Sequence, residues 1–239
     1  MNFPVTRWSV LAVASLNGDT TSTRALDELC RNYWQPVNGF IRLRGFREME
    51  AEDLTQTFLT HLCEHSVWRK AVAEQGRFRS FLLGALHHFL ADELDRRNAQ
   101  KRGSGAEHVE FNEESIPNAT DPGAEAQFDR AWALSILERA FNSVRDEFAA
   151  EDKSAVFLVL KNFLPGAREP LSLEDAAAKL QLPLPTLKTH VHRLRARFRD
   201  RVREQVAATV SAPHEVAEEW AHLQRVLMDR GNDFTPRES

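Results

Sequence analysis

Residues 172–198 read SLEDAAAKLQLPLPTLKTHVHRLRARF, and this stretch predicts two helices joined by a tight junction. Ser172 is a good N-cap for the first helix, and acidic residues fall in the turn that follows it. Pro183 cannot continue that helix, because proline lacks an N–H and disfavours helical geometry in the residue before it. Pro185 suits the first turn of a second helix. The pattern is typical of a helix-turn-helix.

The second of these helices has two distinct faces. Apolar residues recur at helical spacing, and we expect them to point inward: Leu187, Val191, Leu194 and Phe198. A helix that enters the major groove needs long cationic and short polar side chains near its N-terminal half, and arginines further along suit phosphates. The candidate DNA-binding residues are therefore Thr186, Lys188, Thr189, His190, His192, Arg193, Arg195 and Arg197. The alternative is a solvated basic surface helix.

The charge of the chain is segregated, although its net value is only −4. Residues 186–203 carry seven basic side chains and one acid, whereas residues 103–121 carry five acids and no Lys or Arg. The acidic stretch contains Gly and Ser and lacks periodic apolar residues, so it cannot bury enough surface to offset the entropy of ordering. We therefore expect a flexible acidic linker over residues 103–123.

The remaining apolar residues also recur at helical spacing, which indicates an all-α protein. We expect helices over about 26–41, 48–62, 78–97, 128–148 and 156–163, and a final amphipathic helix that carries Val216, Trp220, Leu223 and Leu227. The sequence thus predicts two small helical domains, residues 1–102 and 124–206, joined by the linker. A C-terminal helical extension, residues 207–239, either regulates the protein or caps the core of the second domain.

Several classes of protein are disfavoured by composition. The two cysteines, Cys30 and Cys63, occupy apolar positions of helical patterns, which favours reduced buried thiols over a disulfide. No apolar run approaches the roughly 20 residues of a membrane span, so we expect a cytoplasmic protein without a membrane partner. His61 and His65 lack a further ligand cluster, and no catalytic constellation stands out. We therefore expect no metal, no cofactor and no enzymatic activity.

Residues 172–195 resemble the fourth region of the extracytoplasmic-function (ECF) sigma factors, which direct bacterial RNA polymerase to promoters. That region has a pattern like SxEExAxxLxLxxxTVKSxxHRAR. The residues that fall in register with it, without a gap, are Ser172, Glu174, Asp175, Ala177, Leu180, Leu182, Thr186, Leu187, Lys188, Thr189, His192, Arg193 and Arg195. The resemblance implies that the second helix reads the minus-thirty-five promoter element. Pro183 and Pro185 depart from the Ser and Gly that are usual in the family.

Residues 49–58, MEAEDLTQTF, resemble the pattern DAEDLxQxxF in the second region of the same family. The resemblance implies that this helix docks on the clamp coiled coil of the largest polymerase subunit. An acidic helix with an apolar stripe suits a basic partner, and the alternative is a solvated acidic face. The implied polymerase-binding residues are Glu50, Glu52, Asp53, Leu54, Gln56 and Phe58.

Residues 78–97, FRSFLLGALHHFLADELDRR, resemble the next block of the family, FRxWLxxIARNxAxDxLRR. The resemblance implies that this helix and the loop before it read and melt the minus-ten element. Melting needs pockets for a flipped base and cations for the single strand. The implied residues are Arg77, Phe78, Arg79, Phe81, His88, Arg96 and Arg97. Phe81 and His88 stand where the family usually has Trp and Asn.

Together these blocks, about residues 26–102 and 128–203, imply a sigma factor that directs promoter recognition and transcription initiation. Its expected partners are promoter DNA and core RNA polymerase, which it would contact through the clamp coiled coil and the flap region. An anti-sigma or other regulatory protein is a further candidate partner. Two alternatives stay open. One is a helix-turn-helix regulator that binds DNA without polymerase. The other is a sigma-like adaptor without promoter-melting activity, which Phe81 and His88 favour.

Overall fold

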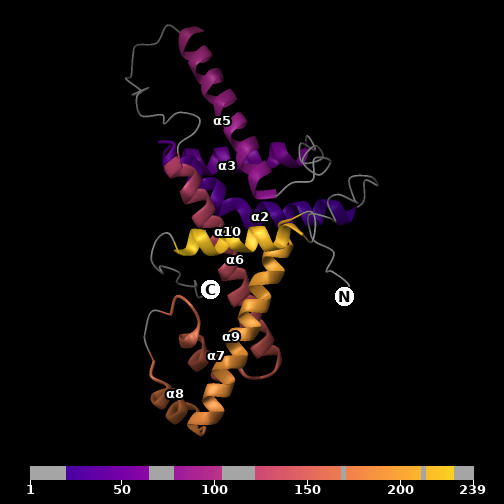
Figure 1. Cartoon of the computed structure of the whole chain (residues 1–239). Helices are drawn as coiled ribbons and strands as arrows, with labels where there is room; N and C mark the ends of the chain where they lie inside the picture. The colour runs from indigo at the N-terminus through magenta and orange to yellow at the C-terminus, as the bar shows by residue number, and fades with distance from the viewer. Residues whose placement is uncertain (1–19, 65–77, 104–121, 168–170, 211–213, 229–239) are drawn as a thin grey trace. The chain divides into compact units, whose positions relative to one another are not determined.

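The computed structural model describes residues 20–64, 78–103, 122–167, 171–210 and 214–228, and every regular element in these ranges is helical (Figure 1). The predicted all-α class is therefore confirmed. Among these helices, none is long and apolar enough to cross a membrane. Residues 104–121, which make up most of the predicted linker, lie outside the described residues, and so does Arg77.

The chain forms two compact units. The first consists of Met1–Trp132 and Ala208–Glu215, and the second of Ala133–Ala207 and Val216–Ser239. The division falls inside one continuous helix, α6 (Pro122–Ala150), so the N-terminal part of α6 belongs to the first unit and its remainder to the second.

The first unit is built from α2 (Thr20–Leu43), α3 (Glu48–Glu64), α5 (Phe78–Gly103) and the beginning of α6. α2 packs against α3, and the two are separated by Gly45, whose φ of 86° is in the left-handed region that favours glycine. Aromatic contacts join the helices of the first unit. The ring centroids of Tyr33 and Phe78 are 4.9 Å apart, those of Phe58 and Phe89 5.4 Å, and those of Phe40 and Phe128 6.2 Å.

The second unit contains the rest of α6, α7 (Ser154–Leu160), the 3-10 turn η2 (Lys161–Phe163), α8 (Leu173–Leu180), α9 (Leu184–Ala207) and α10 (Glu215–Met228). Phe157 of α7 lies 5.4 Å from both Phe141 and Phe148 of α6, measured between ring centroids. α7 also contacts α8 and α9. The Phe157 ring therefore holds α7 against α6, and α7 in turn contacts α8 and α9.

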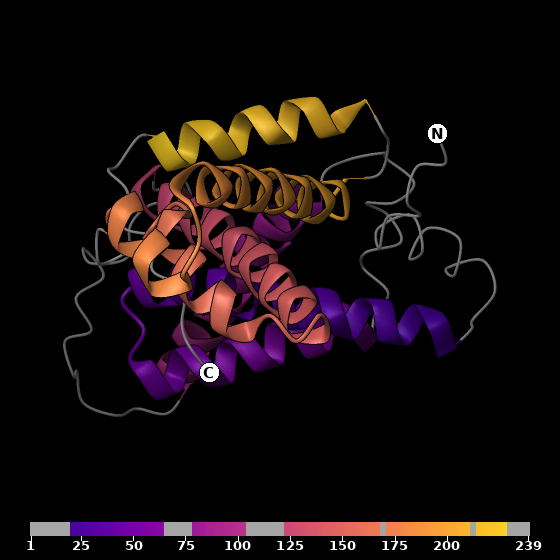
Figure 2. The same cartoon turned by 90° about the horizontal axis from the view of Figure 1, so that it is seen from below.

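α10 crosses α9 near the C-terminal end of α9, and the two helices are neighbours in both views (Figures 1 and 2). The Arg203 guanidinium is 5.3 Å from the centroid of the Trp220 ring, and Leu223 is buried. Met228, the last residue of the helix, is 78% exposed. α10 therefore covers part of the core of the second unit with one face and leaves its end in solvent.

Two helix bounds differ from the sequence-based expectation. α5 continues to Gly103, beyond the predicted end at Arg97, and α6 begins at Pro122, inside the predicted linker. Proline at the first turn of a helix costs little, because its missing N–H would have no partner there. The apolar periodicity that located α6 begins only at Phe128, so the preceding turn gave no signal in the sequence.

Candidate nucleic-acid interface

α8 begins at an N-cap residue and ends at a residue in the left-handed region, directly before the junction with α9. The Ser172 hydroxyl accepts a hydrogen bond from the backbone N–H of Asp175 at 3.0 Å, which makes it the predicted N-cap of α8. Gln181 ends α8 in the left-handed region, with a φ of 53°. Leu182 and Pro183 then lead into α9, which begins at Leu184 with Pro185 in its first turn.

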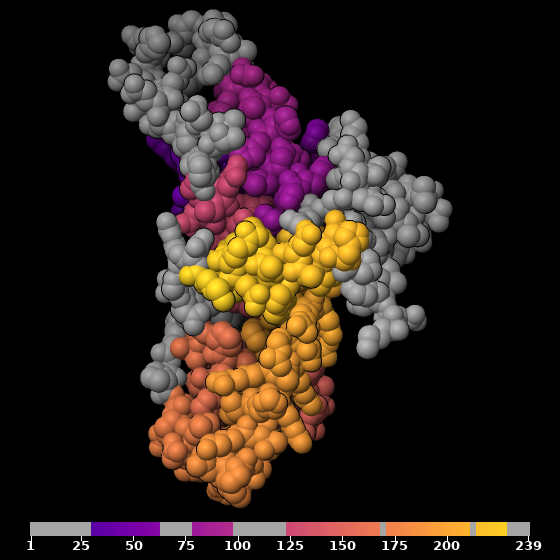
Figure 3. All heavy atoms as spheres, in the orientation of Figure 1, coloured from indigo at the N-terminus to yellow at the C-terminus, as the bar shows by residue number. Residues whose placement is uncertain are grey.

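α9 has the two faces that the sequence predicts. The four inward positions, Leu187, Val191, Leu194 and Phe198, are all buried, with relative exposures of 0%, 6%, 1% and 5%. The candidate DNA-binding residues lie on the other side, where all of them are exposed except the half-buried His190. Atoms of α9 reach the surface along the helix on the face drawn in Figure 3.

The basic side chains of α9 fall into two groups. Within the part of the chain that the structure describes, Lys188, His192 and Arg193 make no hydrogen bond and no ion pair. They extend from the N-terminal half of the helix, where the resemblance places base-reading residues. Nothing described competes with a ligand for them.

Three arginines further along α9 have partners in the second unit. Arg195 donates from Nε to the backbone carbonyl of Phe163 at 3.0 Å. Arg197 lies 3.3 Å from a carboxylate oxygen of Glu151, and Arg201 pairs with Glu147 of α6. These contacts hold Arg195, Arg197 and Arg201 on residues of the second unit, whereas Lys188, His192 and Arg193 near the start of α9 have no such partner among the described residues.

The candidate minus-ten residues at the start of α5 are buried. Phe78 is fully buried, and its backbone N–H donates to the carbonyl of Thr209 at 3.2 Å. Arg79 is 7% exposed, donates from Nη1 to the Asp129 carboxylate at 2.6 Å and lies 5.3 Å from the centroid of the Trp132 ring. Phe81 is half-buried. In this conformation Phe78 packs against Tyr33 of α2, and Arg79 joins α5 to α6.

The later candidates of α5 form a separate cluster around Glu93. Arg96 donates to the Glu93 carboxylate at 2.6 Å, and Arg97 donates to it at 2.9 Å and also pairs with Glu50 of α3. Burial opposes ionisation of Glu93, but the hydrogen bonds from Arg97 and Arg96 outweigh it and lower the pKa of this carboxyl. His88 is exposed. The minus-ten candidates that the structure describes are therefore not gathered into one site.

Sequence reasoning missed the partners of these arginines. Asp129 and Glu50 lie 50 and 47 residues away from Arg79 and Arg97 along the chain, so spacing gives no indication of the pairing. Acids near the start of a helix are expected there from the helix dipole alone, so their type and place did not reveal the pairing either.

The candidate polymerase-binding residues divide between two faces of α3. Leu54 and Phe58 are buried at 6% and 2% exposure, whereas Glu52, Asp53 and Gln56 are exposed. Glu50 is half-buried through its pair with Arg97. Met49, next to these acids, is 80% exposed. We call Met49, Glu52, Asp53 and Gln56 the α3 ridge. It combines negative charge with one flexible apolar side chain.

His87 of α5 is held between two charged partners in the first unit. An Arg44 guanidinium nitrogen lies 3.4 Å from Nδ1 of His87, and a Glu125 carboxylate oxygen lies 3.4 Å from Nε2. Because arginine only donates, Nδ1 accepts and the proton of the neutral ring faces Glu125. Burial and the nearby Arg44 lower the pKa of His87, against the opposing effect of Glu125.

Within the described residues, no group of three or more His, Cys, Asp or Glu side chains is placed to hold a metal ion. Comparisons with models of protein families, with curated proteins and with solved structures found no significant match to this chain. The geometry of α9 and the sequence patterns are therefore what supports a function.

Proposed function

We propose that this protein is a promoter-recognition factor of the ECF sigma type, which binds core RNA polymerase and directs where transcription starts. The observation that carries the proposal is the division of α9. Its apolar stripe is buried, while Lys188, His192 and Arg193 project into solvent without a described partner. A helix with this division presents side chains of the types that read base edges and phosphates in the major groove.

The α3 ridge supports the second half of the proposal, binding to polymerase. Its carboxylates are exposed on a helix whose opposite face is fixed in the core by Leu54 and Phe58. Such a rigid acidic surface fits a basic partner, because complementary charge steers association and fixes its register. The resemblance of residues 49–58 to the polymerase-docking pattern of the family points to the same role.

The test is transcription reconstituted from the protein, core polymerase of its own host and fragmented host DNA, with sequencing of the RNA 5′ ends. The expected result is discrete starts that share two spaced upstream elements and that are absent without the protein. In the variant Arg193→Ala we expect these starts to fall about fivefold or more, corresponding to loss of roughly 1 kcal/mol or more of DNA contact. Arg225→Ala is the matched control, because Arg225 is an exposed cation on α10.

A second candidate, a sigma-like adaptor without melting activity, is favoured by the burial of Phe78 and Arg79. A single strand has no access to these two side chains while Arg79 is paired with Asp129. This candidate predicts binding to core polymerase without discrete starts. Binding to duplex DNA without any binding to core polymerase would instead point to an ordinary helix-turn-helix regulator.

A further inference from the structure

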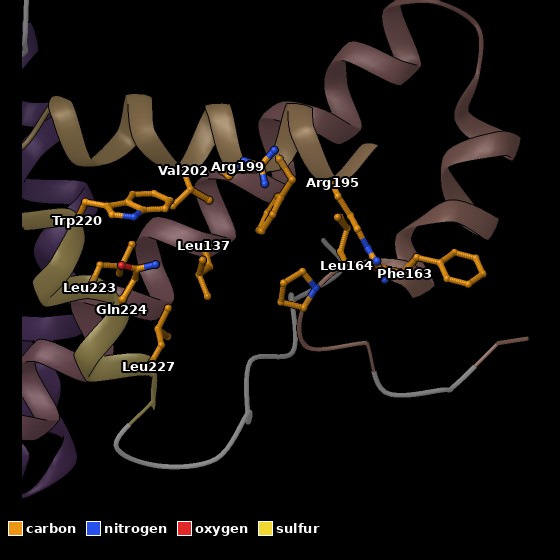
Figure 4. A pocket seen from close by; sticks show the side chains of 12 residues that line it. Leu137, Phe163, Leu164, Arg195, Arg199, Val202, Trp220, Leu223, Gln224 and Leu227 are labelled. Atoms are coloured by element: carbon orange, nitrogen blue, oxygen red, sulfur yellow. Dashed lines mark hydrogen bonds between the residues drawn. The ribbon is translucent and has the colours of Figure 1, made fainter. Parts of the chain in front are cut away.

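The second unit contains a cavity of about 490 Å³ between α6, α9, α10 and the turn after η2 (Figure 4). Its floor is apolar, with Leu137 of α6, Phe198 and Val202 of α9, and Leu223 of α10, all buried. Trp220 and Leu227 of α10 line one side, and Leu164 lies across from them (Figure 4). Pro165 also belongs to the lining. Volume and lining are those of a small-molecule site, since such pockets measure about 300–1,000 Å³ and are mostly apolar.

The polar residues that line this cavity lie at its opening to solvent, which we call the mouth. Arg195, Arg199 and Gln224 line it and are exposed, whereas the floor residues are buried. Arg195 and Arg199 are four residues apart on α9, so their side chains extend from the same face of the helix. The described carboxylates of other helices and turns that pair with cations of α9 contact Arg197 and Arg201, which do not line the cavity.

The two guanidinium groups differ in how they are held. Arg195 is fixed by the hydrogen bond from its Nε to the Phe163 carbonyl, which leaves its two Nη groups for a ligand. Arg199 makes no hydrogen bond or ion pair with any residue that the structure describes. A guanidinium binds a carboxylate in a planar, two-pronged geometry. The mouth therefore offers positive charge directly beside an apolar cavity.

We propose that this cavity binds an amphipathic carboxylate, a linear or aromatic acid whose apolar body lies on the Leu137 floor and whose carboxylate pairs with Arg199 and Arg195. Apolar lining alone would fit a neutral ligand equally well, and the two cations select the anion. The inference does not depend on promoter recognition, because it concerns ligand binding by the second unit alone.

The test is isothermal titration calorimetry of the full chain with octanoate, decanoate and dodecanoate, each below its micelle concentration. The expected result is saturable binding of one molecule per chain, tightening by about tenfold for each two added methylenes until the cavity is full. Decanol, which has the same chain without the charge, should bind more weakly. Binding that does not saturate, or that is equal for decanoate and decanol, overturns the proposal.

Two variants locate the site. Arg199→Gln should weaken decanoate by about two- to fivefold and leave decanol unchanged, since an exposed ion pair contributes modestly. Its control is Arg193→Gln, an exposed arginine of the same helix that does not line the cavity. Leu227→Glu, at a half-buried wall position, should abolish binding of both ligands while circular dichroism stays unchanged. Undiminished binding in Leu227→Glu would place the ligand elsewhere and overturn the assignment.

Discussion

Gln181 carries the turn between α8 and α9 in the left-handed region, with a φ of 53°. A non-glycine residue there costs about 1–2 kcal/mol, whereas glycine pays roughly 0.5–1 kcal/mol of additional entropy on folding. We therefore expect Gln181→Gly to raise the free energy of unfolding by about 0.5–1 kcal/mol in urea denaturation. Gln181→Ala is the control, and it should give no gain because alanine keeps the Cβ. A glycine variant less stable than the parent would contradict the expectation.

His87 makes the stability of the first unit depend on pH. Burial and Arg44 lower the pKa of His87 in the folded protein below the unfolded value of about 6.5. The unfolded chain therefore takes up the proton first as the pH falls, so this contribution to stability is complete above about pH 6.5 and is lost below it.

We expect the free energy of unfolding, measured by urea denaturation, to decrease from pH 7.5 to pH 5.5. Glu93 adds a loss of the same sign, but only below the unfolded carboxyl value of about 4.5. His87→Gln removes the titrating group and should flatten the dependence between pH 7.5 and 5.5. An equally steep dependence in that variant would assign the effect to other groups.

At the scale of the elements, the Arg79–Asp129 pair ties the start of α5 to α6. The side chains are 8% and 19% exposed, so removal of one partner leaves a buried charge. We expect Arg79→Met to lower the free energy of unfolding by about 2–4 kcal/mol, and Arg79→Met with Asp129→Asn to recover part of that loss.

The exposed pair between Arg42 and Glu48, at 3.3 Å, provides the comparison. Arg42→Met should cost less than about 1 kcal/mol in the same denaturation experiment, because water screens the pair. Similar losses in the two single variants would show that burial does not set the strength of the Arg79 pair.

Helices with a strong apolar period are the elements that the sequence predicts well. Leu187, Val191, Leu194 and Phe198 are buried as expected, because a period of 3.6 residues fixes which side chains share a face. Helix ends without apolar residues, such as the first turn of α6, carry no such signal. Ion pairs between helices, such as Arg79 with Asp129, depend on packing that local spacing does not encode. The sequence therefore predicts which face of α9 is buried and which is exposed, but not which residues of other helices pair with the candidate arginines.

At the scale of the whole molecule, a net charge of −4 coexists with the basic stripe of α9. If α9 binds duplex DNA, its cations displace counterions and affinity falls steeply with salt. We expect Lys188→Ala to reduce the slope of log affinity against log salt by about one, measured by fluorescence anisotropy with duplex DNA. Arg225→Ala should leave the slope unchanged. A slope unaffected by Lys188→Ala would remove this residue from the phosphate contacts.

The exposure of Met49 and Met228 gives the protein two built-in chemical reporters. The two residues are 80% and 78% exposed, so we expect mild peroxide to convert their thioethers to sulfoxides, which mass spectrometry detects as a gain of one oxygen. Met49 belongs to the α3 ridge, and Met228 follows Leu227 at the wall of the cavity. A partner that covers the α3 ridge should slow oxidation of Met49 and not of Met228. The peptides that contain the two methionines therefore report separately on the α3 ridge and on the cavity, without any substitution in the chain.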